Sequence, residues 1–586
     1  MSELIVGIDL GTTQSAVAVV DSGFPILLAD ENGHRLTPSA VWFAESGEVE
    51  VGSKALRRSG VESVVTSVKS LMGRRCDEVP GRLTEAGKVV TPAGELSPER
   101  ISSLILGRLQ EIAQSHLEKP VLKAVITVPA YFHDGQRAAT KRAGELAGLE
   151  VVRILSEPTA AALSFGLDRL NEHSKVSVFD LGGGTFDVSI LEMRDGVFEV
   201  ISTAGDTELG GDNFDRSIAT SMAKNFDLDW NGLDPLDQVR WIDEARRVKH
   251  SLSEAENATY RIPFVGESEL SRLDLEELMK GELGRMERCC HRALQDGQLK
   301  SGDLSSVVMV GGSSRIPCVQ ALVRKVFEQE PDLSQHPDEA IAKGAAIQAG
   351  ILSGAIQEVL LLDVTPLSLG IETMGGLMNV LIPRNTTIPC KAGEMFTNAV
   401  DHQTQMQVKV LQGERELAAD NWTLGLFDVE FESHRRGQAR VGVEFRIDAD
   451  GILSVLARDI STGKDTIIEV GSAAVDVRES RVEQMVSESV EYAFEDMKAR
   501  VFEEARLKAQ ELLPAVQSAL EQAGEFLSQD ERSSIIECKK EVESALEAGV
   551  GALLKASVEK LDEVTETLAA ILVERATGEF FSGPQG

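Results

Sequence analysis

Two aspartates and a run of glycines stand close together in the middle of the chain. An apolar run ends at Asp180, glycines fill positions 182–184, and Thr185 and Asp187 follow. The run predicts a buried strand, and glycines directly after a strand let backbone N–H groups approach a phosphate closely. An aspartate repels phosphate, but it can hold a hydrated cation that the phosphates also hold. The spacing therefore predicts a phosphate loop beside a metal-binding carboxylate.

A shorter copy of this pattern opens the chain. An apolar run leads into Asp9, and Gly11, Thr12 and Thr13 follow it. The copy predicts a strand, a turn whose N–H groups and hydroxyls point at the bend, and a returning strand. Taken alone, such a turn is equally well explained as an ordinary hairpin. Two copies in one chain indicate two similar lobes whose phosphate loops face one nucleotide.

Further glycine turns follow later. Gly210 and Gly211 precede a predicted helix, and an apolar run ending at Val310 leads into residues 311–313. The guanidinium of Arg315, just beyond, suits stacking on a base or hydrogen bonding to one. Three strand-into-glycine motifs in one chain together indicate a nucleotide site.

Two charged residues have competing explanations. Lys69 lies in the mostly apolar segment 64–72, predicted as a helix, where a lysine would extend its ammonium group to solvent. Glu157 stands between a predicted strand and a helix that begins with Pro158, where it could act only on the helix dipole. Either residue could instead face the nucleotide, and the pattern leaves both explanations open.

Strands and helices alternate through the first part of the chain. Residues 124–129 predict a strand, Asp134 the cap of a helix, and residues 151–155 the next strand. This alternation predicts an α/β architecture with active residues at strand ends.

The sequence pattern changes after Ile351, where glycines and prolines separate short segments that favour β-strands. Residues 440–447 alternate apolar and polar side chains, and residues 448–451 predict a turn, so we expect an antiparallel β domain. From about Asp476 the apolar period becomes helical, and Pro514 should kink that helix or begin a new one.

Length and charge limit the possible functions. The 586 residues exceed one hydrophobic core, and a net charge of -35 argues against nucleic acid and anionic membranes as partners. No apolar run is long enough to cross a bilayer, and no signal peptide is evident. The six scattered cysteines fit reduced thiols, so we expect a cytoplasmic protein.

The motifs occur in an order that resembles one protein family over about residues 1–575. The segments that resemble the family are residues 7–13, 126–132, 157–162, 179–187, 310–317, 359–363, 366–373 and 385–389. Together they resemble the seventy-kilodalton heat-shock chaperones, the heat-shock protein 70 (Hsp70) family of DnaK and HscA type. The short segment after Phe264 favours the HscA-like branch. Actin-like sugar kinases share the phosphate loops, but they lack the linker and the β domain.

This resemblance implies a multidomain fold. A two-lobed actin-like α/β ATPase domain would occupy residues 1–358, followed by an apolar linker at 359–363. An antiparallel β-sandwich substrate-binding domain would cover 364–475, an α-helical lid 476–575, and a disordered tail 576–586.

The resemblance also implies the residues of an ATPase site that uses ATP, Mg²⁺ and K⁺. Lys69, Glu157, Asp180, Thr185 and Asp187 would be catalytic, and Asp9 and Asp180 would hold Mg²⁺ through water. The nucleotide-binding residues would be Asp9, Gly11, Thr12, Thr13, Gly182, Gly183, Gly184, Gly210, Gly211, Lys249, Ser253, Gly311, Gly312, Ser313, Arg315 and Asp338.

Two further sets follow from the resemblance. An extended apolar peptide would be bound by Ile371, Met374, Phe396, Ala399, Met406 and Val408. The allosteric set would be Pro129, Arg137, Arg153, Leu360, Leu361, Leu362 and Asp363. Glu157 would link the phosphate site to Pro129 and Arg137 and so report the nucleotide state, while Arg153 and Asp363 would lie where a J-domain cochaperone docks.

Three positions depart from the family pattern. Arg246 and His250 stand where DnaK has a glutamate and an arginine against adenine, and Ser156 replaces an asparagine. These departures bear on nucleotide affinity and on the cochaperone surface. Whether a nucleotide exchange factor is needed is left open.

We therefore expect an ATP-dependent chaperone of the stress response that binds and releases unfolded or client polypeptides and assists protein folding. ATP hydrolysis would switch its peptide-binding domain between open and closed states. One alternative is a small-molecule kinase of the actin-like superfamily, which gives no role to residues 364–575. A second alternative is a nucleotide-gated holdase with negligible hydrolysis, motivated by Arg246 and His250.

Overall fold

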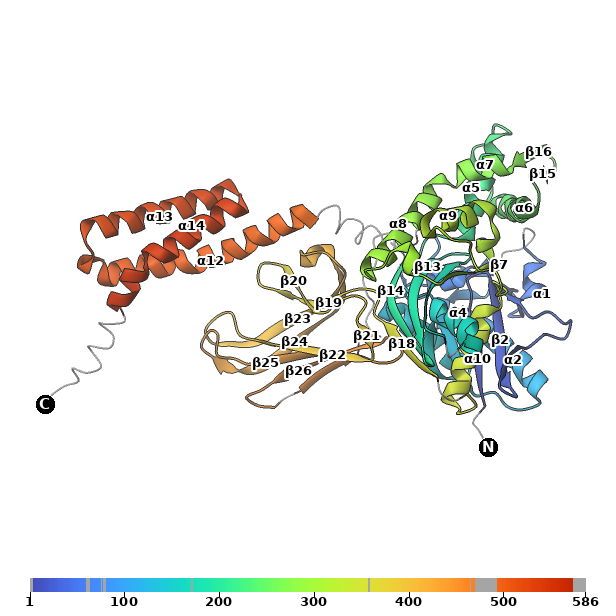
Figure 1. Cartoon of the computed structure of the whole chain (residues 1–586), viewed down its shortest axis with the longest axis horizontal. Helices are drawn as coiled ribbons and strands as arrows, with labels where there is room; N and C mark the ends of the chain where they lie inside the picture. The colour runs from blue at the N-terminus through green and yellow to red at the C-terminus, as the bar shows by residue number, and fades with distance from the viewer. Residues whose placement is uncertain are drawn as a thin grey trace. The chain divides into compact units, whose positions relative to one another are not determined.

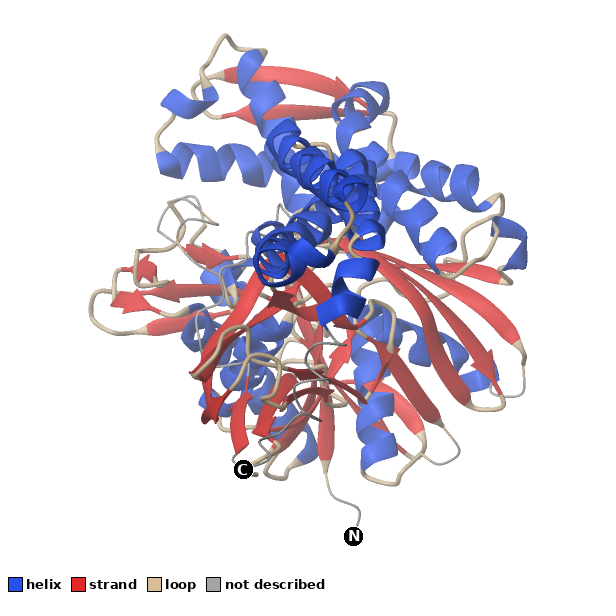
Figure 2. Cartoon of the chain, turned by 90° about the vertical axis from the view of Figure 1, so that its left-hand side faces the viewer, coloured by secondary structure: helices blue, strands red, loops and turns tan. Residues whose placement is uncertain are grey.

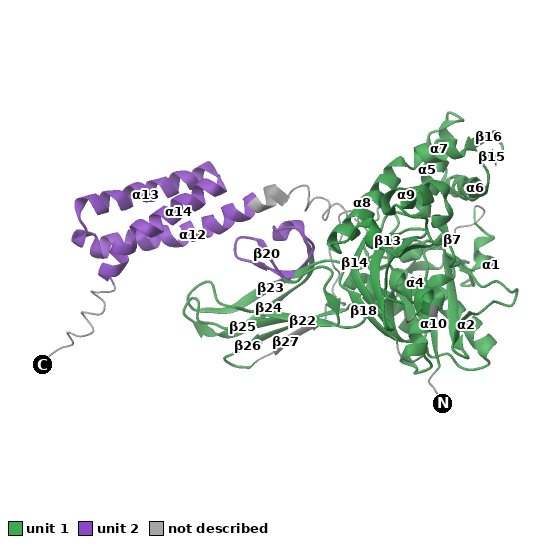
Figure 3. Ribbon diagram, viewed as in Figure 1, with its two compact units in different colours: residues 1–369, 381–407, 423–483 green, residues 370–380, 408–422, 484–586 purple. Residues whose placement is uncertain are grey.

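The computed structural model of the chain describes residues 4–59, 64–74, 76, 79, 81–169, 172–356, 359–463, 465–469 and 493–572. The chain divides into two compact units, coloured separately in Figure 3. The first comprises residues 1–369, 381–407 and 423–483, and the second comprises residues 370–380, 408–422 and 484–586. The predicted helical stripe at 482–492 and the predicted tail lie outside the described residues.

One mixed sheet of the first unit has the order β11-β10-β1-β2-β3, with β4 paired to β2. Its strands are β1 (Ile5–Asp9), β2 (Gln14–Asp21), β3 (Phe24–Leu27), β4 (Thr37–Pro38), β10 (Lys123–Val128) and β11 (Glu150–Ser156). Strands β1, β10 and β11 run parallel, whereas β2 returns antiparallel to β1. The helices α2 (Pro98–Leu117) and α3 (Asp134–Leu146) bury apolar faces in the same core as β1 and β10. The predicted opening strand, turn and returning strand are confirmed.

A second mixed sheet has the order β17-β12-β13-β14-β18-β21. Its strands are β12 (Ser174–Leu181), β13 (Phe186–Arg194), β14 (Val197–Asp206), β17 (Ser306–Val310), β18 (Leu360–Val364) and β21 (Thr387–Ile388). The helices beyond this sheet are α5 (Gly211–Lys224), α6 (Pro235–Glu254), α7 (Arg272–Leu278), α8 (Lys280–Asp296) and α9 (Pro317–Phe327). The apolar segment at 360–362 therefore forms a strand, which pairs in parallel with β14.

Helices α4 (Glu157–Gly166) and α10 (Ala340–Leu352) pack against each other and lie between strands β14 and β2 in the view of Figure 1. Both are buried around most of their circumference and are rich in alanine and glycine. Small side chains allow their backbones to approach, and a Cβ on Gly344 would lie only 1.7 Å from the Ala160 carbonyl oxygen. This packing holds the strand ends of both sheets in fixed positions.

Small elements surround the two sheets, which Figure 2 shows in red with helices on their flanks. They are β5 (Ala40–Phe43), β6 (Val49–Val51), α1 (Ser53–Leu56), β7 (Val64–Thr66), β8 (Val89–Thr91), β9 (Gly94–Leu96), β15 (Asn257–Ile262) and β16 (Gly266–Ser271). Among the described residues, none of the helices combines the length and the apolar character needed to span a membrane.

The first unit also contains a four-stranded antiparallel sheet of order β22-β25-β26-β27. Its strands are β22 (Cys390–Phe396), β25 (Val441–Ile447), β26 (Leu453–Asp459) and β27 (Asp465–Glu469). The alternation predicted for residues 441–447 is confirmed, because every second side chain of β25 is buried. Strand β24 (Trp422–His434) lies almost wholly in this unit too.

In the second unit, β19 (Leu369–Thr373) pairs with β20 (Leu377–Ile382) and with the end of β23 (Gln403–Gln412). Its helices are α12 (Ala493–Ala523), α13 (Gln529–Ala548) and α14 (Gly551–Val564). They share a core that includes Ala509, Val542 and Leu561. Helix α12 continues through Pro514, so the new helix that was one prediction for this proline does not begin there.

Two local predictions are wrong. Residues 64–72 form β7 and a short 3-10 helix (Val68–Leu71), because Ser67 between them adopts a left-handed conformation with φ of 53°. Helix α3 is capped by His133 rather than by Asp134. Backbone Gly135 N–H donates to His133 Nδ1 over 3.0 Å, and Asp134 is the first helical residue.

Candidate nucleotide-binding site

Three buried carboxylates meet where strands of the two sheets end. Asp180 on β12 lies directly opposite Asp187 on β13 in the antiparallel register, and Asp9 ends β1. Like charges directly opposite each other destabilise a sheet. The pair therefore has no structural benefit of its own, which points to a ligand that needs it.

The electrostatics of this carboxylate cluster (Asp9, Asp180, Asp187) support that reading. Burial, followed by the nearby Glu157 charge, raises the pKa of Asp9 to about 7 and that of Asp187 to about 8. The same two causes hold the pKa of Asp180 well above its ordinary value. Asp180 Oδ2 and both carboxylate oxygens of Asp187 make no hydrogen bond of ordinary geometry in the described part of the chain, although the backbone N–H groups of Tyr131 and Ala130 act to lower the pKa of Asp187.

Lys69 and Glu157 form a buried ion pair beside this cluster. Lys69 therefore does not extend to solvent, and its ammonium group lies 5.9 Å from the Phe132 ring centroid. Glu157 is the first residue of α4, as predicted, but its carboxylate pairs with Lys69 rather than serving the helix dipole alone. One ammonium group thus faces four carboxylates, so the site lacks positive charge.

Sequence reasoning missed Thr127, which orients Asp9. Thr127 Oγ1 donates a hydrogen bond to Asp9 Oδ1 over 2.9 Å, and both residues are buried. The only available signal was a polar residue inside the apolar run 124–129.

The two predicted phosphate loops touch. A Cβ on Gly183 would lie 2.0 Å from Thr13 Oγ1, and one on Gly184 would lie 3.1 Å from Thr12 Cγ2. The loop is closed by Gly182 N–H, which donates to the Thr185 carbonyl over 3.0 Å. Only a residue without a side chain fits at position 183, so the two lobes meet there through backbone and threonine hydroxyls.

The other predicted nucleotide residues converge on the same loop. The Gly182 carbonyl oxygen accepts hydrogen bonds from Gly211 N–H and Ser313 Oγ, each over 3.0 Å. Lys249 Nζ in turn donates to the Gly211 carbonyl over 2.9 Å. A Cβ on Gly210 would lie 2.6 Å from the Gly183 carbonyl oxygen.

The loop after β17 completes the arrangement. Gly311 has φ of 78°, and a Cβ there would lie 2.3 Å from the Leu181 carbonyl oxygen. Gly312 follows, and Arg315 Nη1 pairs with Asp338 Oδ2 over 2.7 Å. The third glycine motif thus lies against the end of β12.

Arg246, one of the departures, is held by a carboxylate network. Its guanidinium contacts Asp215 over 2.9 Å, Asp243 over 3.4 Å and Asp212 over 3.5 Å. Asp215 also pairs with Lys249 Nζ over 2.7 Å and is fully buried. The guanidinium is therefore committed to neighbouring carboxylates. Sequence reasoning did not find Asp215, because a single aspartate within a helix carries no signal.

The neighbouring helix positions are arranged differently. Ser253 Oγ donates to the Lys249 carbonyl over 3.2 Å, so it bonds within its own helix. His250 lies one residue beyond Lys249 on α6, and burial, followed by the Lys249 charge, lowers its imidazole pKa.

The predicted allosteric residues form bonds around one loop. Arg137 donates to the carbonyls of Ala130 over 3.2 Å and Phe132 over 3.1 Å, next to Pro129. Its third contact is the Asp450 carbonyl over 3.3 Å. Among the described residues, Glu157 and Arg137 are not bonded directly to each other.

Asp450, which sequence reasoning treated only as a turn residue, is the shared partner. Its Oδ1 lies 3.3 Å from Arg153 Nε and accepts from Ile154 N–H over 3.1 Å. Asp363, at the end of the Leu360-Leu361-Leu362 strand, accepts from Ser156 Oγ over 2.8 Å.

The residues expected in the peptide groove belong to both units. In the second unit, Ile371 and Val408 are buried and Met374 is 56% exposed. In the first unit, Phe396, Ala399 and Met406 are half-buried.

The carboxylate cluster fits a hydrated divalent cation. Unpartnered buried oxygens and a surplus of negative charge call for a cation, and the glycine loops beside them offer N–H groups to phosphate. In the described part of the chain, no three histidine, cysteine or acidic side chains are placed to bind a metal ion directly. Water and phosphate would therefore supply most of the coordination of Mg²⁺.

A comparison with protein-family models agrees with this geometry. The model described as Hsp70 protein matches residues 5–574. This match spans nearly all of the 586 residues, from the first predicted phosphate loop to the last described helix. The chain belongs to the Hsp70 family.

Proposed function

We propose that this chain hydrolyses ATP in order to bind and release extended apolar segments of client polypeptides. As an Hsp70 protein, it is an ATP-dependent chaperone and an ATPase. The observation that carries the proposed site is the carboxylate cluster, in which three buried oxygens of Asp180 and Asp187 lack partners beside two touching glycine loops.

Each part of this site has a role in phosphoryl transfer. Asp9 and Asp180 would hold hydrated Mg²⁺, which would supply positive charge to the phosphates, and Thr127 keeps the Asp9 carboxylate in place. The N–H groups at Gly182, Gly183 and Gly184, together with the hydroxyls of Thr12 and Thr13, hold the phosphates. The remaining nucleotide contacts are Gly11, Gly210, Gly211, Lys249, Ser253, Gly311, Gly312, Ser313, Arg315 and Asp338.

Lys69 is buried and aimed at the cluster, so it stabilises negative charge on the transferred phosphoryl group. Thr185 and Asp187 orient the attacking water, and Glu157 positions Lys69 through the ion pair. We also propose that K⁺ binds at the ATPase site as a second cation beside Mg²⁺.

The proposed coupling route runs through the residues that bond around Asp450. The proposed nucleotide-binding domain (1–358) would act on the proposed peptide-binding domain (364–475) through the contacts of Arg137 and Arg153 with Asp450, and through the proposed linker (359–363), which pairs beside β14. In this proposal, ATP favours this docked arrangement and hydrolysis releases it. A nucleotide that binds the two arrangements with different affinities must shift their populations.

The client would be an extended polypeptide. Ile371, Met374 and Val408, with Phe396, Ala399 and Met406, would bind its apolar side chains, while strand edges pair with its backbone. The helical lid (476–575) would close over it. The proposal includes a J-domain cochaperone docking at Arg153 and Asp363, a cytoplasmic location and an HscA-like specialisation.

Single-turnover ATP hydrolysis, with and without an unfolded apolar peptide, tests this function. We expect the peptide to change the rate of hydrolysis or of nucleotide release, and Lys69→Ala to lose hydrolysis. No effect of peptide, together with transfer of phosphate to a small molecule, would favour the kinase. Equal and negligible hydrolysis in the wild type and in Lys69→Ala would favour the holdase.

A further inference from the structure

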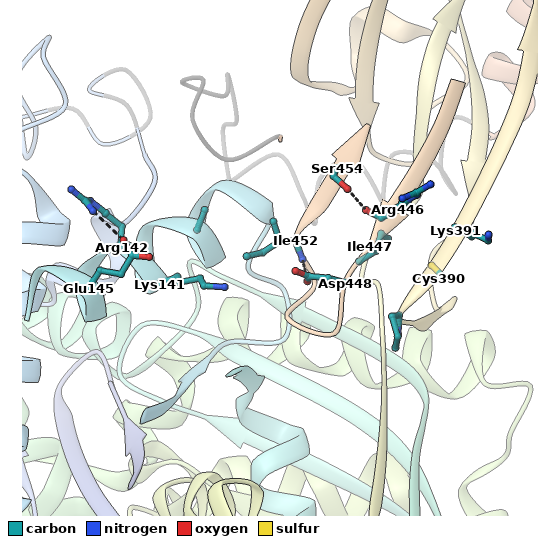
Figure 4. Close-up of a pocket in the computed structure, with 12 residues that line it drawn as sticks. Lys141, Arg142, Glu145, Cys390, Lys391, Arg446, Ile447, Asp448, Ile452 and Ser454 are labelled. Atoms are coloured by element: carbon teal, nitrogen blue, oxygen red, sulfur yellow. Dashed lines mark hydrogen bonds and ion pairs between the residues drawn. The ribbon is translucent and has the colours of Figure 1, made fainter. Parts of the chain in front are cut away.

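An open pocket of about 1170 Å³ lies in the first unit, away from the carboxylate cluster. One wall is helix α3, which contributes Lys141, Arg142 and Glu145. The other wall is the sheet of β22, β25 and β26, which contributes Lys391, Arg446 and Ser454, as Figure 4 shows. No step of the proposed ATPase cycle uses this pocket.

The sheet wall contains an unfavourable charge arrangement. Lys391 on β22 lies directly opposite Arg446 on β25 in the antiparallel register. Side chains at such positions lie close on one face, and like charges there are destabilising. Lys391 is exposed and makes no hydrogen bond or ion pair within the described residues, while Arg446 pairs only with Glu444 on its own strand. The two cations are therefore placed where an anion would relieve their repulsion.

The acidic groups of the pocket are already engaged. Glu145 pairs with Arg142 over 3.0 Å on the helix wall. Asp448 Oδ1 accepts hydrogen bonds from the N–H groups of Asp450 and Ile452, each over 2.9 Å, and so holds the turn. Neither carboxylate is paired with Lys391. Four cations and two carboxylates line the pocket, which is a local exception in a chain with a net charge of -35.

The two walls are held together by polar contacts. Lys141 Nζ lies 3.2 Å from Asp450 Oδ2, and Leu453 N–H donates to Asp134 Oδ2 over 3.1 Å. These contacts join α3 to the turn and to the start of β26. The pocket therefore exists only while α3 and the sheet are apposed, and whatever fills it must stabilise that apposition.

We propose that this pocket binds an acidic polypeptide segment of a partner protein. Its aspartate or glutamate side chains pair with Lys391 and Arg446, and the pocket is larger than a single phosphate or carboxylate needs, since small-ligand sites span about 300–1000 Å³. The apolar residues Pro389 and Ile447 also line the pocket and accommodate the side chains between the acidic ones. Charge complementarity thus identifies the occupant as acidic peptide, a class distinct from the apolar client.

Fluorescence anisotropy of a labelled ten-residue peptide that alternates glutamate and alanine tests this proposal with the full chain. The matched peptide replaces every glutamate with glutamine, and both lack the large side chains that an apolar groove would bind. We expect at least tenfold tighter binding of the glutamate peptide, with an affinity that falls as salt rises. Equal binding of the two peptides would overturn the proposal.

Variants locate the binding. Lys391→Glu should weaken it at least tenfold while raising the thermal midpoint slightly, because it creates an ion pair with Arg446. Lys300→Glu makes the same charge change at an exposed position outside the pocket and should leave the affinity unchanged. Unchanged binding in Lys391→Glu, or an equal loss in Lys300→Glu, would overturn the assignment to this pocket.

Two further measurements distinguish a peptide site from a small-anion site. Asp450→Ala removes the acceptor that joins the walls and should also weaken peptide binding about tenfold. Inorganic phosphate should displace the peptide only at concentrations that act through ionic strength. Displacement at peptide-like concentrations would overturn the proposal in favour of a small-anion site. Peptide binding is measured with a non-hydrolysable ATP analogue, because ATP favours the arrangement in which α3 and the sheet are apposed. The assay needs no hydrolysis, so its failure is distinct from failure of the proposed ATPase function.

Discussion

The phosphate side and the base side of the candidate site treat buried charge in opposite ways. On the phosphate side, Asp180 and Asp187 oppose each other across two strands, and Asp180 Oδ2 and both Asp187 oxygens make no hydrogen bond of ordinary geometry in the described chain. On the base side, Arg246 and Lys249 share the buried carboxylate of Asp215. The buried charges of the phosphate side need a ligand to neutralise them, whereas those of the base side are already paired within the folded chain.

The difference separates function from stability. Buried charges with partners in the chain hold the fold, and removing one partner leaves the other exposed to a low dielectric. Buried charges without partners cost stability, and the protein keeps them because a ligand uses them. Substitutions on the two sides should therefore change stability with opposite signs.

The largest expected effect is on the base side. Asp215→Ala leaves two cations without their buried carboxylate and should lower the free energy of unfolding by about 3–5 kcal/mol. Denaturant unfolding of the nucleotide-binding region measures it. Asp243→Ala is the matched control, because Asp243 is 39% exposed and should cost about 1 kcal/mol or less. Equal effects of the two variants would contradict the proposed importance of the buried network.

Lys69→Ala should have the next largest effect, on chemistry rather than on folding. Loss of one preorganised positive charge at the transferred group lowers the hydrolysis rate by about 10²–10³, or about 3–4 kcal/mol. Single-turnover hydrolysis at saturating ATP measures the rate, with exposed Lys88→Ala as the control. A rate within twofold of the wild type would show that Lys69 does not act on the phosphoryl group.

Asp180→Asn should stabilise the nucleotide-free chain while weakening its function. It removes one of two opposed carboxylates, so the free energy of unfolding should rise by up to about 1 kcal/mol. Affinity for ADP with Mg²⁺ should fall, and the loss should be smaller when Mg²⁺ is omitted. Thermal unfolding and calorimetric titration measure the two quantities. If Asp180→Asn is less stable and binds ADP with Mg²⁺ as tightly as the wild type, the proposed difference between the phosphate side and the base side is wrong.

The pH dependence of the nucleotide-free chain is a further expected effect of the buried carboxylates. Burial holds the pKa of Asp9 at about 7 and that of Asp187 at about 8, above the ordinary value near 4. Between these values the folded state binds protons that the unfolded state has lost, so this contribution to stability falls as pH rises. The thermal midpoint should decrease from pH 6 to pH 8.5, less so with Mg²⁺ and ADP present. An Asp9→Asn, Asp187→Asn double variant should flatten the slope, and an unchanged slope would contradict this cause.

The sequence indicated the phosphate side better than the base side for a physical reason. Asp9 and Asp180 follow apolar runs and precede glycines, so strand periodicity and turn chemistry mark them locally. Asp215 lies within helix α5, and only its contacts with α6 reveal its role. Asp450 looked like an ordinary hairpin residue for the same reason.

The local backbone conformation around Lys69 could not be predicted from the sequence either. The segment around Lys69 has helical apolar spacing, yet Ser67 adopts a left-handed conformation that divides it into a strand and a 3-10 turn. That bend is set by tertiary contacts such as the hydrogen bond from Ser67 Oγ to Asp212 Oδ2 over 2.6 Å. The order of most other strands and helices was predictable, because it depends mainly on periodicity and turn residues.

In the proposed cycle, the nucleotide at the phosphate site controls how tightly a client peptide is bound. Stopped-flow release of a labelled apolar peptide from the full chain, after mixing with ATP and Mg²⁺ or with buffer, tests this coupling. We predict that ATP accelerates release at least tenfold in the wild type and that Asp180→Asn abolishes this acceleration at the same ATP concentration. Equal release rates with ATP and with buffer in the wild type would contradict the account.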